Sequence, residues 1–147
     1  MNITKFFQNS GDVLQFILPT VVGLQDVASD FKEQNYQSGT EKTLKVVTLI
    51  GVQRYGCKLI KWMFPKIRPD GSDYESFPSG HFMIGMQCTV RSFYRDGPNS
   101  LTFLLTVLGT GVIGLGRYLP MKHDVVDLTA GGLLGSLLGG AWNGWIR

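Results

Sequence analysis

Both histidines of the chain lie in short segments whose residue types suit phosphate chemistry. His81 ends the tetrapeptide 78–81 (PSGH), directly before an apolar stretch that predicts a helix. A serine and a glycine ahead of a helix place a hydroxyl and unpaired backbone N–H groups at the positive end of the helix dipole. The segment is therefore predicted to bind an anion, with His81 beside it. A histidine at a helix start more often has a structural role, so the tetrapeptide needs support from elsewhere in the chain.

The second histidine, His123, stands four residues before Asp127 in a segment that begins with Arg117. Pro120 suits the first turn of a helix, and a helix that has begun by His123 places His123 and Asp127 on one face. The carboxylate then accepts a hydrogen bond from the imidazole and stabilises the positive charge that forms when the other ring nitrogen attacks an electrophile. This spacing predicts a nucleophile with its orienting group. The alternative is a surface pair that contributes only a few tenths of a kcal/mol.

A run of cations precedes the PSGH segment. Between residues 42 and 69 the sequence has no acidic side chain and seven basic ones, namely Lys42, Lys45, Arg54, Lys58, Lys61, Lys66 and Arg68. Charge alone favours a helix face that lies against anionic lipid headgroups. The position of the run directly before PSGH favours a phosphate site instead.

Taken together, the three segments resemble the type 2 phosphatidic acid phosphatase superfamily, which also includes bacterial class A acid phosphatases and vanadium haloperoxidases. The pattern of that superfamily is KxxxxxxRP, PSGH and SRxxxxxHxxxD. Here the three parts are residues 61–69 (KWMFPKIRP), 78–81 (PSGH) and 116–127 (GRYLPMKHDVVD), so ten of the eleven specified positions agree. The motifs span residues 61–127 of a single predicted domain, 1–147, and residues 1–40 lie outside them.

The resemblance implies a metal-independent phosphatase that works through a phosphohistidine, with no cofactor. His123 would attack phosphorus, Asp127 would support its imidazolium, and His81 would protonate the leaving group and later activate water. The phosphoryl oxygens would be held by Lys61, Arg68, Ser79, the backbone N–H of Gly80, and Arg117. No metal is expected, because these cations neutralise the phosphate charge and the sequence has no carboxylate cluster spaced as metal ligands.

Two positions depart from the superfamily pattern. Gly116 replaces serine, which removes a hydroxyl whose bond to a phosphate oxygen would be worth roughly 0.5–1.5 kcal/mol. Asp124 follows the predicted nucleophile, where we would expect an aromatic residue, and a carboxylate that pointed into the site would repel an anionic substrate. We expect Asp124 instead at the N-terminal turn of the next helix, where the helix dipole stabilises a carboxylate.

The elements that must position these residues are predicted to be helices. The chain has 147 residues, no strand alternation of useful length, and 17% charged residues, below the roughly 25% of soluble domains. Windows 97–116 and 128–146 carry no ionisable side chain and match the length of about 20 residues that crosses a bilayer. Weaker helical stretches are 12–28, 41–64 and 80–94, with loops at 29–40 and 70–77. We expect an all-α bundle of five or six helices that spans the membrane, similar to the haloperoxidase fold.

The last predicted helix carries two stripes of small residues at four-residue spacing. One stripe is Gly131, Gly135 and Gly139, and the other is Gly132, Ser136 and Gly140. Such stripes let helix backbones approach closely in lipid. The sequence leaves open whether they pack within one chain or join chains into a homo-oligomer through the helix at 128–146.

A lipid phosphate monoester or a lipid pyrophosphate is the expected substrate, because the predicted spans bring the three motifs to one face of the bundle at headgroup depth. The opposite face carries Lys42, Lys45, Arg91, Arg95 and Arg147, and the positive-inside tendency makes that face cytoplasmic. We therefore expect a multi-pass protein of the bacterial inner membrane with an extracytoplasmic site. Nucleic acid is not an expected partner, since the net charge is only +3 and the cations alternate with apolar residues.

Two alternative functions stay open. One is a soluble or peripheral acid phosphatase of the same superfamily, and detergent dependence of extraction separates it from a membrane enzyme. The other is a membrane protein that binds a lipid phosphate without hydrolysing it. The glycine at position 116 and the short N-terminal region favour this second alternative.

Overall fold

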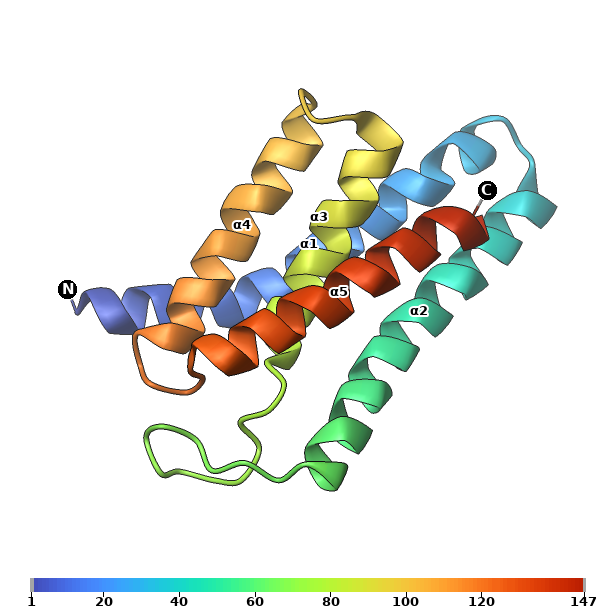
Figure 1. Ribbon diagram of the computed structural model, residues 1–147. Coiled ribbons are helices and arrows are strands. Elements are labelled where there is room, and N and C mark those ends of the chain that lie inside the picture. The colour runs from blue at the N-terminus through green and yellow to red at the C-terminus, as the bar shows by residue number, and fades with distance from the viewer. Residues whose placement is uncertain (1, 147) are drawn as a thin grey trace.

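The computed structural model describes residues 2–146, and within that range all regular secondary structure is helical (Figure 1). Five helices follow one another along these residues: α1 (Ile3–Lys32), α2 (Tyr36–Met63), α3 (Gly80–Asp96), α4 (Leu101–Tyr118) and α5 (Val125–Ile146). A long loop, 64–79, connects α2 to α3 and contains an isolated β-bridge between Lys66 and Glu75. The prediction of an all-α bundle with five or six helices is confirmed.

The helices are longer at the N-terminal end of the chain than the sequence predicts. The predicted loop at 29–40 is wrong, because α1 continues to Lys32 and α2 begins at Tyr36. Pro19 lies inside α1 without ending it. The polar residues of this region are helix ends that hold each other: Asp30 accepts hydrogen bonds from Ser38 and Lys42 across the connection. The predicted loop at 70–77 is confirmed as part of loop 64–79.

Helix α3 lies in the middle of the bundle and packs most closely against α5 (Figure 1). The glycine stripe of α5 makes this possible. A Cβ atom at Gly131, Gly135 or Gly139 would come closer than 3.0 Å to a backbone carbonyl oxygen of the facing segment, contributed by Ser79, Met83 and Gln87 in turn. Both series repeat every four residues, so the two backbones touch along their length. This stripe therefore packs within the chain, and it fixes PSGH against the start of α5.

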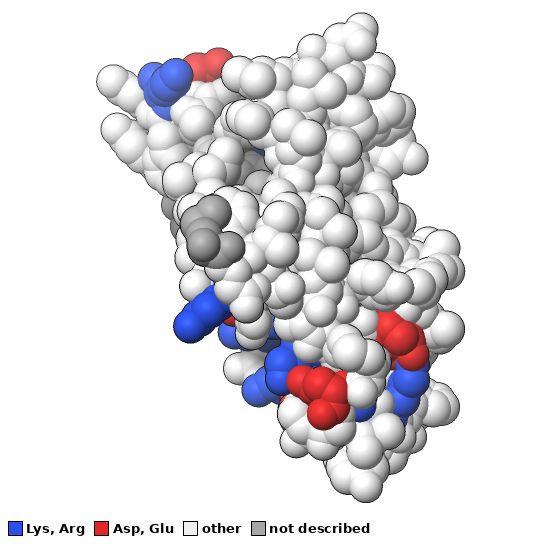
Figure 2. Space-filling view, turned by 90° about the vertical axis from the view of Figure 1, so that its left-hand side faces the viewer, with Lys and Arg blue, Asp and Glu red and all other residues white. Residues whose placement is uncertain are grey.

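The outer surface of α4 and α5 is apolar. Both helices are long and apolar enough to cross a membrane. Large side chains such as Leu104, Leu108, Leu133 and Leu137 are exposed, whereas Thr106 and Thr110 are buried. Figure 2 shows one face of the molecule, on which charged side chains gather toward the two ends and leave a broad uncharged area between them. This distribution agrees with two helices that are apolar enough to cross a membrane.

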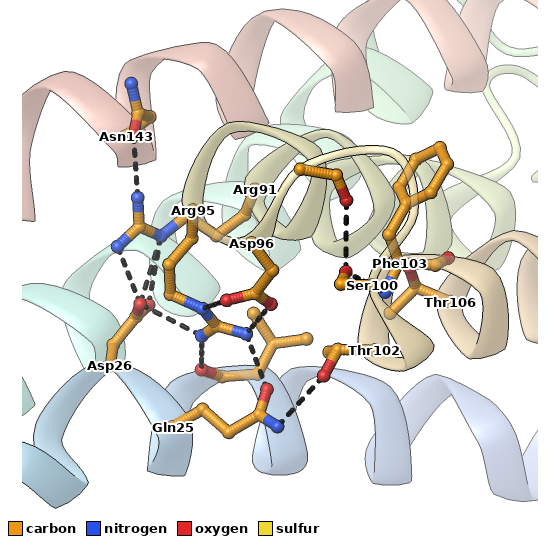
Figure 3. Close-up of polar contacts among 12 residues, drawn as sticks. Gln25, Asp26, Arg91, Arg95, Asp96, Ser100, Thr102, Phe103, Thr106 and Asn143 are labelled. Carbon is orange, nitrogen blue, oxygen red and sulfur yellow. Dashed lines mark hydrogen bonds and ion pairs between the residues drawn. The ribbon is translucent and has the colours of Figure 1, made fainter.

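The end of the bundle farther from the histidines holds a buried ion network (Figure 3). Asp26 of α1 accepts hydrogen bonds from Arg91 and Arg95 of α3, and Arg91 also donates to Asn143 of α5. Since Arg91 lies ten residues beyond His81 on α3, the network lies about 15 Å along that helix from the histidine. It ties α1, α3 and α5 together at one end of the bundle.

Candidate active site

The three predicted motifs meet at the other end of the bundle. Loop 64–79 lies against the turn 119–124, where the Asp70 N–H donates to the Met121 carbonyl at 3.0 Å and the Lys122 ammonium lies 2.6 Å from the Asp70 carboxylate. This ammonium lowers the pKa of Asp70. Arg68 donates to the Lys122 carbonyl at 3.5 Å, and the Ser79 N–H donates to the Asp127 carbonyl at 3.0 Å. Hydrogen bonds and an ion pair between segments that are distant in sequence thus join all three motifs.

His123 is buried but lies before α5 rather than on it. The prediction that a helix has begun by His123 is wrong, and Pro120 belongs to the preceding turn, because α5 begins at Val125. The Nδ1 atom of His123 is 3.7 Å from Oδ2 of Asp127, which is within ion-pair range but too long for a hydrogen bond. The two side chains still face each other, as the spacing predicts.

The start of α5 is fixed by two aspartates that cap it reciprocally. The Asp127 N–H donates to the Asp124 carboxylate at 2.9 Å, and the Asp124 N–H donates to Asp127 at 3.1 Å. This is the geometry of a capping box. Asp124 therefore lies at the N-terminal end of the helix, as expected, and its charge is paired with Lys66 at 2.6 Å.

Lys66 is a site residue to which sequence reasoning assigned no role. Its ammonium lies 2.8 Å from Asp127 as well as 2.6 Å from Asp124, so one cation neutralises both carboxylates. The Ser76 hydroxyl donates a further hydrogen bond to the Asp127 carboxylate. Asp127 is thereby held in a fixed orientation beside His123. The available sequence signal was the location of Lys66 between Lys61 and Arg68, inside the first motif.

The electrostatics of the site keep His123 neutral. Burial, together with the positive charges of Lys61 and Arg68, lowers the pKa of His123 to about 4. A neutral imidazole is the form that can act as a nucleophile. Burial, followed by the positive charges of Arg68, Lys61 and Arg54, also lowers the pKa of His81 to about 4. Lys61 and Arg68 are therefore shared by both histidines, and this places the four side chains in one neighbourhood.

His81 occupies the first turn of α3, after the N-cap residue Ser79. The buried Ser79 hydroxyl makes no hydrogen bond to the helix and has no partner within residues 2–146. The hydroxyl and the free N–H groups at the start of α3, including that of Gly80, are thus available to an anion.

Arg117 is buried in the last turn of α4, where its guanidinium pairs with Asp12 of α1. Asp12 also lies 3.5 Å from Nε2 of His81, so one carboxylate contacts two predicted phosphate-site residues. Asp12 was missed because residues 1–40 lie outside the motifs. Asp12 stands directly before the largely apolar stretch 13–24, and a carboxylate at the edge of such a stretch was the signal that could have found it.

The glycine at position 116 has a structural reason. A Cβ atom there would come closer than 3.0 Å to the carbonyl oxygen of Phe7. Helix α1 therefore occupies the space that the serine side chain of the superfamily pattern would need. The same helix supplies Asp12. The close packing of α1 on α4 therefore explains both the missing serine hydroxyl at position 116 and the presence of the Asp12 carboxylate beside Arg117.

Three of the predicted site residues have buried polar atoms without a protein partner in the described chain: Ser79 Oγ, Arg117 Nε and His123 Nδ1. A buried polar group left unsatisfied costs about 1–3 kcal/mol, and such groups are uncommon in folded proteins. Similar atoms of Gln87, Ser92 and Trp142 lie on α3 and α5. The three site atoms differ from these because they belong to residues of the predicted phosphate site, where the three motifs meet.

Comparison of the chain with protein-family models, with curated proteins and with solved structures gave no match. The likeness to the phosphatase superfamily therefore depends on the three motifs, and the function argued from it is a proposal.

Proposed function

We propose that the protein is a membrane-bound, metal-independent phosphatase of the type 2 phosphatidic acid phosphatase kind, which hydrolyses a lipid phosphate through a phosphohistidine. The observation that carries this proposal is the set of unpartnered buried atoms of Ser79, Arg117 and His123 at the point where the motifs meet. A phosphate group supplies acceptor oxygens for the hydroxyl and the guanidinium.

In the first step, Nε2 of His123 attacks phosphorus, because Nδ1 faces Asp127. The P–O bond to the lipid breaks as the N–P bond forms, and His81 gives its proton to the departing oxygen. The bound phosphate anion and Asp12, which lies 3.5 Å from Nε2, supply the negative charge that stabilises protonated His81 in the complex. The new positive charge on His123 is balanced by Asp127. Lys61, Arg68, Arg117, the Ser79 hydroxyl and the Gly80 N–H hold the phosphoryl oxygens, where the transition-state charge is spread.

In the second step, neutral His81 accepts a proton from water while the water oxygen attacks phosphorus. The N–P bond breaks, inorganic phosphate leaves, and His123 returns to its neutral form. Each histidine ends in its starting protonation state. The low pKa of His123, about 4, keeps it unprotonated between turnovers.

The surface of α4 and α5 supports the proposed membrane location. Only 39% and 33% of their most apolar windows are buried, whereas the core helix of a soluble protein is mostly buried. The exposed leucines suit lipid better than water, which favours a membrane enzyme over a soluble acid phosphatase. The site lies at one end of the bundle, where the headgroup of a lipid substrate would be.

The proposed orientation, in a bacterial inner membrane with an extracytoplasmic site, depends on the cations at the far end of the bundle. Arg91 and Arg95 pair with buried Asp26, and Arg147 lies outside the described residues. Lys42 and Lys45 remain near the surface and count toward the positive-inside tendency. A Gly71→Cys variant in loop 64–79 tests the orientation: an impermeant maleimide should label it in intact cells, and labelling only after lysis would reverse the assignment.

The activity is tested by phosphate release from a panel of lipid phosphates by the purified protein in detergent, with and without vanadate. Wild-type protein should release phosphate and vanadate should inhibit. A Lys45→Ala variant is the matched control, since Lys45 pairs with Glu41 away from the site. Loss of activity in Lys45→Ala equal to that in His123→Ala would contradict the site assignment.

A second function is favoured by one contact. Asp12 already pairs with Arg117 and competes with the phosphoryl oxygens for this guanidinium. A pocket that keeps this ion pair would bind a lipid phosphate without hydrolysing it. Vanadate binding without phosphate release from any lipid of the panel would support this binding protein over the enzyme.

A further inference from the structure

The Asp127 carboxylate is fully buried, and a charge in that position needs hydrogen-bond partners. Within residues 2–146 it accepts hydrogen bonds from three groups. The Lys66 ammonium donates to Oδ1 at 2.8 Å, whereas the Ser76 hydroxyl and the Asp124 N–H donate to Oδ2, the latter at 3.1 Å. Oδ2 is also the atom that lies 3.7 Å from Nδ1 of His123. Lys66 therefore holds one oxygen, and Ser76 holds the oxygen that faces the proposed nucleophile.

Lys66 and Ser76 reach Asp127 from opposite arms of loop 64–79. The Ser76 N–H donates to the Lys66 carbonyl at 3.0 Å, and the Lys66 N–H donates to the Tyr74 carbonyl at 3.2 Å. This pairing of the two arms, which includes the β-bridge between Lys66 and Glu75, brings both side chains to the start of α5. The loop thus presents a cation and a hydroxyl to one carboxylate as a single unit.

The Lys66 ammonium is shared by two carboxylates, since it lies 2.6 Å from Asp124 and 2.8 Å from Asp127. One positive and two negative charges leave the cluster with a single net negative charge. His123 must be neutral when it attacks phosphorus and becomes positive when it carries the phosphoryl group. One net negative charge matches that one positive charge. Two unopposed carboxylates would instead favour a protonated His123 before any substrate binds, because nearby opposite charge stabilises the charged form.

We propose that Lys66 and Ser76 are positioning residues for the proposed reaction, which act on His123 through Asp127. Lys66 sets the amount of negative charge that the carboxylate presents to the imidazole, and Ser76 fixes the oxygen that faces it. This inference depends on the proposed function. Lys66 stands at an unspecified position of the first motif and Ser76 lies outside the motifs, so the superfamily pattern assigns a role to neither.

A purely structural role would use the same contacts but have different consequences. If Lys66 and Ser76 only compensated for the burial of Asp127, their loss would lower stability and leave the ionisation of His123 unchanged. The ionisation of His123 is therefore the quantity that distinguishes a positioning role from a structural one.

A charge series in the full-length protein in detergent tests the role of Lys66. The cluster carries one net negative charge in wild type, two in Lys66→Met, none in Asp124→Asn, and one again in the double variant. Asparagine is a good N-cap residue, so Asp124→Asn keeps the start of α5. NMR titration of isotope-labelled histidines gives the pKa of His123, whose signal is assigned by its loss in His123→Ala. This pKa should be highest in Lys66→Met, by about one unit or more, lowest in Asp124→Asn, and close to wild type in the double variant.

The other ionisable groups at this end of the bundle are the same in every member of the series. They are Asp12 of α1, Lys61 of α2, Arg68, Asp70, Asp73 and Glu75 of loop 64–79, His81 of α3, Arg117 of α4 and Lys122 of the turn 119–124. A difference between the variants in the pKa of His123 therefore comes from the cluster around Lys66.

Two further variants control for the loss of a lysine. Lys66→Arg keeps the charge and should leave the pKa of His123 at its wild-type value. Lys42→Met breaks a comparable pair, in which the lysine lies 2.8 Å from the largely buried Asp30 at the connection of α1 and α2, and it should also leave that pKa unchanged. A pKa of His123 that does not rise in Lys66→Met, or does not return in the double variant, would overturn the role of Lys66.

Ser76→Ala tests the hydroxyl. It should lower kcat for a lipid phosphate about tenfold and leave KM within about twofold, because a hydrogen bond to a buried carboxylate is lost while the phosphate contacts remain. Ser92→Ala is the matched control, since it removes the hydroxyl of another fully buried serine, which lies on α3 near the other end of the bundle and should not affect kcat. Equal losses in both variants, or a change in KM alone, would overturn the role of Ser76.

The titration needs no turnover, so it separates the role of Lys66 from the proposed function. If the charge series holds but wild-type protein releases no phosphate from any lipid, the proposed function fails and the control of His123 by Lys66 stands. If wild-type protein releases phosphate but the charge series is absent, the positioning role fails and the phosphatase stands.

Discussion

Two buried arginines, Arg91 of α3 and Arg117 of α4, lie at opposite ends of the bundle and pair with a carboxylate of α1 in different ways. At the far end, Arg91 donates from Nε and Nη2 to Asp26 and from Nη1 to Asn143, and the Asp26 side chain is fully buried (Figure 3). At the near end, the guanidinium of Arg117 pairs with Asp12 through Nη2, its Nε has no protein partner in the described chain, and 45% of the Asp12 side chain is exposed.

The difference distinguishes a structural network from a binding site. A buried charge is tolerated when its hydrogen bonds are complete, as they are around Asp26. Incomplete bonding at Arg117 leaves the folded protein with a polar group that a ligand can satisfy. Substitutions at the far end should therefore change stability and leave catalysis intact, whereas substitutions at the near end should do the opposite.

The largest effect is expected for His123→Ala. Removal of the nucleophile should lower phosphate release on the order of 10⁴-fold or more, because no phosphohistidine can form. The stability of the protein should change little, since Nδ1 of His123 has no hydrogen-bond partner in the described chain. Phosphate release and the thermal unfolding midpoint, measured on the same preparation, check both statements. An active His123→Ala protein would reject the site.

Asp26→Asn should have the largest effect on stability. The change leaves the buried Arg91 without its counter-charge, whereas Arg95 keeps Asp96, and breaking a buried pair costs about 3–5 kcal/mol. The rate per folded molecule should stay at the wild-type value. Denaturant unfolding in detergent measures the first quantity and titration of active sites the second.

Asp12→Asn is the matched control at the near end, where the side chain is half exposed. It should lose less stability than Asp26→Asn, because 45% of the Asp12 side chain is exposed and water can screen the charge that is left on Arg117. If Asp12→Asn costs as much stability as Asp26→Asn, the two ends do not differ in the way proposed.

The sequence predicted the residues at the near end of the bundle, where the histidines lie, but not the contribution of α1 to that site. The motifs identified Lys61, Arg68, Ser79, Arg117 and both histidines, and the structure joins these segments. Asp12 belongs to no motif, because its role depends on the close approach of α1 to Gly116. A glycine in the sequence does not indicate which segment packs against it. The start of α5 was predictable: Asp124 and Asp127 have the spacing of a capping box.

Gly116→Ser tests whether this close approach holds the near end together. Restoring the serine of the superfamily pattern should not improve substrate binding. The new Cβ would press on the Phe7 carbonyl, and such overpacking costs about 1–3 kcal/mol. The unfolding free energy measures the loss. Wild-type stability with a lower KM would mean that α1 yields and that the hydroxyl reaches the phosphate.

The smallest effect expected is a shift of a pH profile. Because the pKa of His123 is about 4, the acid limb of kcat/KM, which reports ionisations of the free enzyme, should fall well below the ordinary histidine value of about 6.5. The positive charge of Lys61 opposes protonation of the imidazole, so Lys61→Gln should raise the pKa and move the limb toward higher pH, whatever it does to the absolute rate. Lys45→Gln removes a cation from the same helix outside the site and should leave the limb in place. An acid limb that does not move in Lys61→Gln, or that moves in both variants, would mean that the charge of Lys61 does not lower the pKa of His123. The end of the bundle with the histidines would then lack the feature that distinguishes it from the Asp26 network, namely cations held close to a group that must stay neutral.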